Sequence, residues 1–247
     1  MSKRSSGSNS SGFHSPGFQL PLAIRPDDSA TFANFCVLPT VALVVGELQR
    51  LLDDKTHAYL YLCGIEGSGK SHLLQACVQA AEKAGLAALY LPLAELQHYS
   101  PEDVFASAAG FDVVALDDLQ LVIADPQWQA ALFGFYNRCR DDNRKLVIAA
   151  DRPVNELDCA LADLRSRLGW GGIFRLPLID DDGRAKILQH RAAQLGLVME
   201  DEVVRFVLSR ASRDLTELMK VLDQLDQASL SQQRKLTLPF VKQVMNW

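Results

Sequence analysis

The stretch that decides the fold is "GIEGSGKS", which runs from Gly64 to Ser71. It fits the pattern G-x-x-x-x-G-K-[ST], in which glycines let the backbone curl until successive N–H groups point at phosphate oxygens. The apolar, β-rich run "AYLYLC" precedes it, and "HLLQACVQAAEKAG" follows with its apolar residues on one helical face. A strand, a glycine-rich loop and a helix in this order predict a nucleotide-binding α/β domain.

Each residue type in this loop suits a separate task. The Lys70 ammonium is expected to reach the β- and γ-phosphates, and the Ser71 hydroxyl to ligate Mg²⁺. The helix N-terminus adds a favourable partial positive charge for an anion. The predicted nucleotide contacts in and beside the loop are Gly64, Gly67, Ser68, Gly69, Lys70, Ser71 and His72.

Two further apolar runs end in acidic residues. "VVALDD" ends in Asp117 and Asp118, and "LVIAAD" ends in Asp151. The carboxyl edge of a parallel sheet is where magnesium and phosphate sites form. We expect Asp117 to hold Mg²⁺ through water, Asp118 to act as the base that orients an attacking water, and Asp151 to touch the γ-phosphate or that water. A plain turn residue before Arg152 is the alternative for Asp151.

The order of the remaining segments predicts two folded domains. Apolar strand patterns alternate with helical ones as far as "GIFRLPL", which is typical of a parallel sheet covered on both faces. From about Asp180 onward every segment reads as a helix. The predicted fold class is therefore α/β with a parallel sheet, followed by a small all-helical lid. The predicted boundaries are a Ser- and Gly-rich tail at 1–28, the α/β domain at 29–178 and the lid at 179–247.

Composition limits the partners. The net charge of −5 argues against tight binding of nucleic acid by charge alone, because phosphate contacts need clustered Lys and Arg. The five cysteines contain no C-x-x-C pair, which argues against a zinc site or a disulfide framework. We see neither a secretory signal nor an apolar run of membrane-spanning length. We therefore expect a cytoplasmic protein that does not bind membranes.

Four short segments carry a family resemblance. "TFANF" (Thr31–Phe35), "LDDLQ", "AADRP" and "SRLGWG" resemble the bacterial replication initiator family DnaA, of the AAA+ class. The resemblance implies an adenine nucleotide, ADP or ATP, with Mg²⁺. It also implies that Arg167 is an arginine finger offered in trans, and that Arg213 is a second sensor in the lid. Taken alone, each arginine also fits a solvated surface.

One departure points to a branch of that family. An initiator would continue into a basic helix-turn-helix domain, whereas this sequence stops after the lid pattern. The chain is therefore similar to the Hda branch, the DnaA-homologous regulatory inactivators of replication initiation. That resemblance implies a regulator that binds the DNA-loaded clamp and stimulates hydrolysis of DnaA-bound ATP, giving inactive DnaA-ADP. Its own ATPase activity is expected to be weak or absent.

The tail holds the matching partner motif. "QLPLAI", Gln19 to Ile24, is similar to the segment by which Hda-like proteins dock on the β sliding clamp of DNA polymerase III. Gln19 offers both a donor and an acceptor, and Leu20, Leu22 and Ile24 suit an apolar pocket. The expected partners are this clamp and DnaA-ATP, with DNA contacted mainly through the clamp.

Other functions stay open on the sequence. A helicase loader or a clamp-loader-like ATPase shares the loop and the lid, but gives no use for "QLPLAI". A phosphate-loop kinase leaves Arg213 and "SRLGWG" without a role. The acidic balance disfavours a DNA-tethering module. The sequence leaves open whether the chain forms a homo-oligomer and which base its pocket prefers.

Overall fold

The computed structural model describes residues 27, 29–53 and 59–247, and the predicted clamp motif at 19–24 lies outside them. At its centre are five parallel strands in the order β2-β3-β4-β1-β5. The strands are β1 (Tyr59–Cys63), β2 (Ala88–Pro92), β3 (Val113–Asp117), β4 (Lys145–Ala150) and β5 (Gly172–Arg175). The first four are almost wholly buried, which explains their continuous apolar runs.

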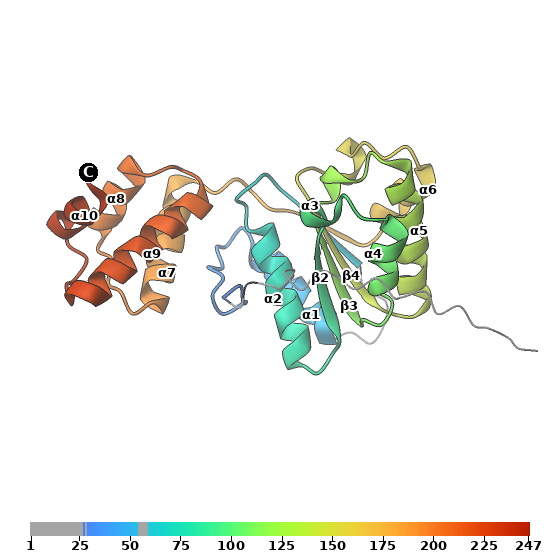
Figure 1. The fold of residues 1–247 in the computed structure, drawn as a ribbon, viewed down its shortest axis with the longest axis horizontal. Coiled ribbons are helices and arrows are strands. Elements are labelled where there is room, and N and C mark those ends of the chain that lie inside the picture. The colour runs from blue at the N-terminus through green and yellow to red at the C-terminus, as the bar shows by residue number, and fades with distance from the viewer. Residues whose placement is uncertain (1–26, 28, 54–58) are drawn as a thin grey trace, which may run out of the picture.

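Helices cover both faces of the sheet (Figure 1). The helices α1 (Ala42–Asp53) and α2 (Lys70–Lys83) pack on one face. The other face carries α3 (Leu93–Leu96), α4 (Pro101–Ser107), α5 (Pro126–Asp141) and α6 (Ala162–Leu168). Two short 3₁₀ turns, η1 (Leu119–Leu121) and η2 (Val154–Glu156), follow β3 and β4.

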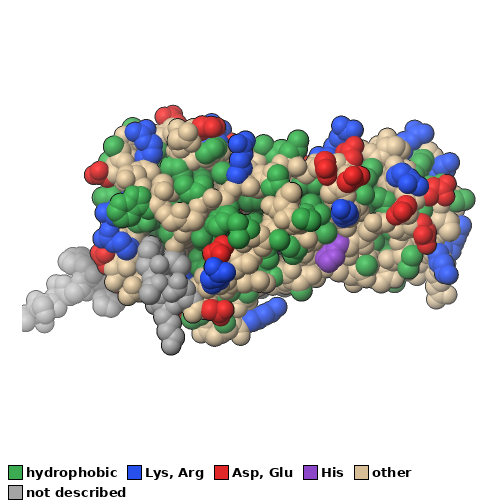
Figure 2. Space-filling view, turned by 180° about the vertical axis from the view of Figure 1, so that it is seen from behind, with side chains coloured by type: hydrophobic (Ala, Val, Ile, Leu, Met, Phe, Trp, Pro, Cys, Tyr) green, Lys and Arg blue, Asp and Glu red, His purple; other side chains and the backbone are tan. Residues whose placement is uncertain are grey.

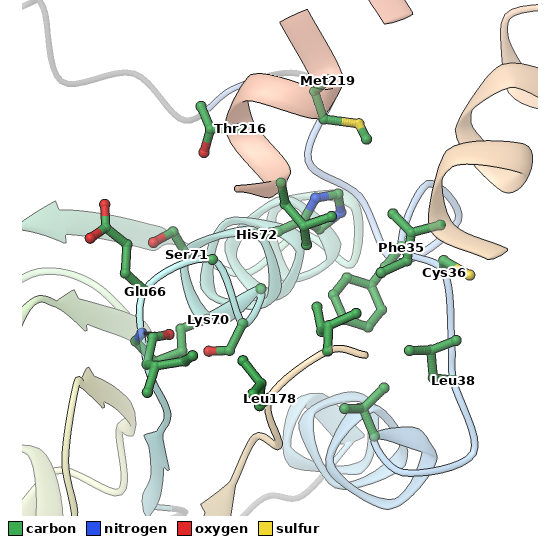
Figure 3. Close-up of a pocket in the computed structure, with 18 of the residues that line it drawn as sticks. Phe35, Cys36, Leu38, Glu66, Lys70, Ser71, His72, Leu178, Thr216 and Met219 are labelled. Atoms are coloured by element: carbon green, nitrogen blue, oxygen red, sulfur yellow. Dashed lines mark hydrogen bonds between the residues drawn. The ribbon is translucent and has the colours of Figure 1, made fainter. Parts of the chain in front are cut away.

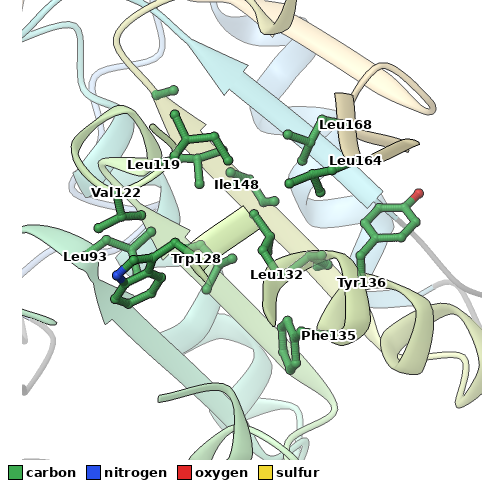
Figure 4. Close-up of a cluster of buried hydrophobic side chains, with 14 of the residues drawn as sticks. Leu93, Leu119, Val122, Trp128, Leu132, Phe135, Tyr136, Ile148, Leu164 and Leu168 are labelled. Atoms are coloured by element: carbon green, nitrogen blue, oxygen red, sulfur yellow. The ribbon is translucent and has the colours of Figure 1, made fainter. Parts of the chain in front are cut away.

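Aromatic side chains fill the core between the sheet and α5 (Figure 4). The ring of Phe105 stacks on Phe135 with centroids 4.9 Å apart, and meets Trp128 edge-on at 5.8 Å. Such offset and edge-to-face pairs add to the free energy gained by burying the rings. This packing supports the sheet beneath the loops that leave its carboxyl edge.

Local capping explains where several helices begin. The side chain of Ser100 accepts from Asp103 N, and Pro101 lies in the first turn of α4. Asp125 caps α5 in the same way and is also followed by proline. Side-chain oxygens at these positions satisfy N–H groups that have no partner within the helix.

The C-terminal helices form a second body with its own core. They are α7 (Asp181–Gln194), α8 (Asp201–Arg210), α9 (Leu215–Gln232) and α10 (Leu238–Met245). Leu188, Leu218, Leu222, Leu225 and Phe240 are fully buried among them. Figure 1 shows this lid as a separate helical body on the α2 side of the sheet. The predicted fold class, a parallel α/β domain followed by an all-helical lid, is confirmed.

The surface carries both charge signs. In the face shown in Figure 2, acidic and basic side chains are interspersed at both ends of the molecule, and hydrophobic ones gather between them. Within the described part of the chain, no helix is long and apolar enough to cross a membrane.

Candidate nucleotide-binding site

The glycine-rich loop joins β1 to α2 at the carboxyl edge of the sheet. Gly69 has φ of 92°, a left-handed conformation that suits glycine. A Cβ there would also lie 3.0 Å from the ring of Phe35, so the loop could not approach this ring with a larger residue. Lys70 and Ser71 are the first residues of α2. The predicted strand–loop–helix unit is therefore present in the structure.

Lys70 is buried at this loop, with only 7% of its surface exposed. Its Nζ donates to the carbonyl oxygens of Gly64, at 2.7 Å, and Ile65, at 2.9 Å. A buried ammonium needs such partners, because it has left water. These bonds hold the charge beside the loop's N–H groups, where an anionic phosphate would be favoured.

Asp117 lies at the end of β3, with 1% of its surface exposed. Its Oδ2 accepts from Tyr90 Oη at 2.8 Å, and its Oδ1 accepts from Asp118 N at 3.0 Å. Burial raises the pKa of this carboxyl, while hydrogen bonds from Ser71 and Tyr90 oppose the rise. The bond to Ser71 places the two predicted Mg²⁺ ligands side by side.

These residues fit a magnesium ion of the nucleotide-bound type. Over the described residues, no cluster of three or more His, Cys, Asp or Glu side chains could hold a metal ion. Mg²⁺ in nucleotide sites commonly takes one or two protein oxygens and completes its shell with phosphate and water. The Ser71 hydroxyl supplies one such oxygen, and the Asp117 carboxylate would hold the ion through water.

Gln120 links the two other predicted acids. Its Nε2 donates to Asp118 Oδ1 at 3.0 Å, and its Oε1 accepts from Asp151 N at 3.1 Å. The Asp151 carboxylate itself receives two 2.7 Å hydrogen bonds from Arg152, and this contact lowers its pKa. Asp118 and Asp151 both face the cleft beside the loop. The structure thus joins the ends of β3 and β4 through one amide side chain.

A cleft of about 1070 Å³ opens between the loop, the N-terminal segment and the lid. Of the predicted nucleotide contacts, Gly67, Ser68, Gly69, Lys70, Ser71 and His72 line it. Figure 3 shows Phe35 and Leu38 on one side, Leu178 below, and Met219 reaching in from α9. An apolar wall beside a phosphate loop is the arrangement that a base and its phosphates require.

His72 supports this wall from α2. Its Nε2 lies 2.9 Å from Thr31 O, and its ring lies 5.2 Å from that of Phe35. Burial lowers the pKa of the imidazole, which keeps the ring neutral near pH 7. His72 therefore fastens the "TFANF" segment to the helix that begins at the loop.

Arg213 lies at the edge of the site. It lines a smaller cavity of about 270 Å³ that borders the loop. Its Nη2 lies 3.3 Å from Asp181 Oδ2, and its backbone oxygen accepts from Arg184 Nε at 2.8 Å. The side chain is therefore near the phosphate loop, but is paired with an acid of its own lid.

Arg167 lies away from the cleft and the smaller cavity. It is half-buried in the last turn of α6, with its guanidinium 5.1 Å from the centre of the Trp170 ring. Trp170 is 61% exposed. Among the described residues that line the two cavities, Arg167 does not occur. The structure brings the predicted loop residues and the acids Asp117, Asp118 and Asp151 to one edge of the sheet, with Arg213 of the lid nearby, and leaves Arg167 outside both cavities.

The sequence did not point to Tyr90 or to a role for Gln120. A hydroxyl in the apolar run "AALYLPL" was the available sign for Tyr90. Pairing Tyr90 with Asp117 also needs the register of β2 on β3, in which Pro92 lies opposite Asp117. That register is set by the tertiary structure and not by the local sequence.

Comparisons with known proteins agree with this geometry. Residues 27–175 match the family model of the bacterial DnaA ATPase domain, and residues 181–245 match that of the Hda lid domain. The chain is 38% identical to an uncharacterised protein of Haemophilus influenzae, over 92% of this chain and 98% of that one.

Solved structures share the fold. Domain III of the replication initiation protein DnaA from Thermotoga maritima superposes with a TM-score of 0.75 at 21% identity, covering 90% of this chain and 98% of that chain. AMPPCP-bound DnaA from Aquifex aeolicus superposes with a TM-score of 0.71 at 22% identity, covering 83% of this chain and 68% of that chain.

Proposed function

The chain belongs to the DnaA family of AAA+ proteins and carries an Hda-type lid, and from this premise we propose how it acts as a DnaA-related regulator of replication. It binds the β sliding clamp loaded on DNA and stimulates hydrolysis of ATP bound to DnaA. The product is DnaA-ADP, which cannot initiate again. A cytoplasmic location, as the sequence predicts, belongs to the same proposal.

The position of Arg167 carries this proposal. An arginine finger acts on a nucleotide held by a neighbouring subunit, so it must lie outside its own cleft. Arg167 meets that condition, since it lies at the end of α6 beside the exposed Trp170. An arginine supplied in trans is worth about 10³–10⁵ in the rate of hydrolysis. The nearby ring restricts the guanidinium without taking up its N–H donors.

The chain's own nucleotide site has a supporting role in this scheme. Lys70 and the loop N–H groups bind the phosphates, and the apolar wall around Phe35 and Met219 takes an adenine base. When bound, Mg²⁺ would offset the negative charge of the phosphates, with Ser71 as its protein ligand and Asp117 holding it through water. Because both domains line the cleft, ADP or ATP would set how the lid lies against the α/β domain.

The motif at 19–24 would tie the activity to the period of DNA synthesis. The clamp is on DNA once synthesis has begun, so a chain that holds the clamp is concentrated where replication is in progress. Tethering raises the effective concentration of Arg167 near DnaA without any new contact at the catalytic interface. Gln19 and the apolar residues Leu20, Leu22 and Ile24 are the residues we assign to that contact.

The test is hydrolysis of labelled ATP bound to DnaA, with and without clamp loaded on DNA. The Arg167→Ala variant should lower the stimulated rate of ATP hydrolysis by about 10³-fold or more. It should still bind the clamp and ADP. Arg165→Ala is the matched control, an exposed arginine on the same helix, and should stimulate normally. A Gln19→Ala, Leu20→Ala variant should lose the part of the stimulation that depends on the loaded clamp.

Two outcomes would contradict the proposal. Stimulation that survives in Arg167→Ala removes the finger assignment. An intact chain that leaves DnaA-bound ATP unchanged, while hydrolysing ATP rapidly by itself, favours the helicase-loader or clamp-loader-like alternative.

A further inference from the structure

A line of polar side chains runs from the N-terminal segment to Asp117, the predicted Mg²⁺ carboxylate. Asp27 N donates to Gln75 Oε1 at 2.7 Å. The Gln75 side chain lies beside that of Tyr90, and Tyr90 Oη donates to Asp117 Oδ2 at 2.8 Å. Two side chains therefore lie between the backbone of Asp27 and the Asp117 carboxylate.

The fold brings these four residues together from separate elements. Gln75 lies on α2, which packs over β2 and β3. Tyr90 lies in β2 and Asp117 at the end of β3, the neighbouring strand. Tyr90 is 8% exposed and Asp117 is 1% exposed. A hydroxyl bond to a carboxylate in such a site is shielded from water, so its loss leaves the carboxylate poorly held.

At Asp27, the outer end of this line, two hydrogen bonds hold the backbone on α2. Gln79 Nε2 donates to Asp27 O at 2.7 Å, and Gln79 is one helical turn from Gln75. The two glutamines therefore hold both backbone polar groups of Asp27 on α2. In the sequence, only Arg25 and Pro26 separate Asp27 from Ile24, the last residue of the predicted clamp motif.

We propose that Tyr90 is a positioning residue for Asp117, and that Gln75 couples this pair to the segment at Asp27. Binding of the clamp next to Asp27 then changes the affinity of the distant site for Mg²⁺–ADP, and Mg²⁺–ADP changes the affinity for the clamp by the same factor. The coupling to the clamp rests on the proposed function, whereas the positioning role of Tyr90 does not.

The first measurement needs no clamp. The affinity of the full chain for ADP is measured by calorimetry with Mg²⁺ and with EDTA, and their ratio reports how well the Mg²⁺ ligands are held. Tyr90→Phe and Gln75→Leu should lower this ratio by about fivefold, the worth of one ordinary hydrogen bond, and leave the affinity in EDTA unchanged.

Tyr59→Phe is the matched control. It removes another buried tyrosine hydroxyl, which donates to Leu168 O at 3.1 Å, and it should keep the wild-type ratio. A wild-type ratio in Tyr90→Phe overturns the positioning role. So does an equal decrease in Tyr59→Phe, because the effect would then reflect general loosening of the sheet.

The second measurement adds the β sliding clamp at saturation. The affinity for Mg²⁺–ADP should shift in the wild-type chain and stay unshifted in Gln75→Leu, which should still bind the clamp. A clamp-induced shift of the same size in Gln75→Leu overturns the coupling. A wild-type chain that does not bind the clamp overturns the proposed function and the coupling together, and the first measurement still decides the role of Tyr90.

Discussion

At the scale of single residues, the site depends on two buried charged groups that have hydrogen-bond partners. Lys70 donates to two carbonyl oxygens of its own loop, and Asp117 accepts from Tyr90 and from a backbone N–H. Each of these groups would be costly to bury alone. Their partners fix where the charges lie before any ligand arrives, and such preorganisation lowers the cost of binding.

His72 gives a pH-dependent prediction at this scale. Burial holds its folded pKa below the ordinary value of about 6.5, so the unfolded state binds more protons between those two values. The free energy of unfolding that the neutral ring contributes is present above about pH 6.5, and is lost as pH falls through the folded pKa.

The measurement is urea unfolding without nucleotide at about pH 7.5 and about pH 5.5, on either side of that ordinary value. The wild type should lose more stability between these conditions than His72→Gln does. Comparing the two pH values within each variant cancels the lost bond to Thr31. Equal losses in both proteins would show that the ring is protonated as easily when folded as when unfolded.

At the scale of elements, the turn between α6 and β5 is tightly constrained. Gly171 has φ of 101°, and a Cβ there would lie 2.8 Å from the backbone oxygen of Tyr59. This close approach lets β5 pair with β1 as an edge strand directly after the helix that carries Arg167. The position of Arg167 relative to the sheet therefore depends on a glycine four residues away.

Two glycine substitutions test this account. Gly171→Ala should lower the free energy of unfolding by about 1–3 kcal/mol, because it adds backbone strain and a clash. Gly46→Ala in α1 should raise it by about 0.5–1 kcal/mol, since that position is exposed, helical and free of neighbours within 4 Å. Denaturant unfolding measures both. A neutral Gly171→Ala would mean that the turn relaxes without cost.

At the scale of the whole molecule, two domains with separate cores meet at one cleft. The lid core and the two cores of the α/β domain contain different residues, while the cleft is lined from both domains. Gln194 Nε2 also donates to Ala33 O at 3.0 Å, which ties α7 to the segment before α1. A ligand that fills the cleft should therefore stabilise the lid as well as the loop.

Leu222→Ala tests that linkage. Leu222 is fully buried in the lid, and its truncation should lower lid stability by about 2–5 kcal/mol. ADP at about 100 times its Kd should return about 2.7 kcal/mol. Hydrogen exchange of α9, with and without ADP, measures the effect.

A Lys70→Met variant serves as the control for this exchange experiment, because it should lose the response to ADP. If ADP protects α2 and leaves the exchange of α9 unchanged in Leu222→Ala, the lid is independent of the nucleotide.

Local patterns were sufficient for much of this protein. The "GIEGSGKS" loop, the apolar strands and the change to helices after Asp180 each depend on residues close in the chain, so the sequence alone predicts them correctly. The acids at the ends of β3 and β4 also follow, because the carboxyl ends of parallel strands share one edge of the sheet.

The tertiary structure alone decided which distant side chains meet. Tyr90 reaches Asp117 only because β2 pairs with β3 in one register, and Gln120 reaches Asp151 only because β3 lies beside β4. Strand order and register depend on packing across the whole domain, and a shift of one residue would turn each side chain to the other face. The placement of Arg167 outside the cleft and the pairing of Arg213 with Asp181 have the same origin: such contacts are set by how elements pack, and no single segment encodes that.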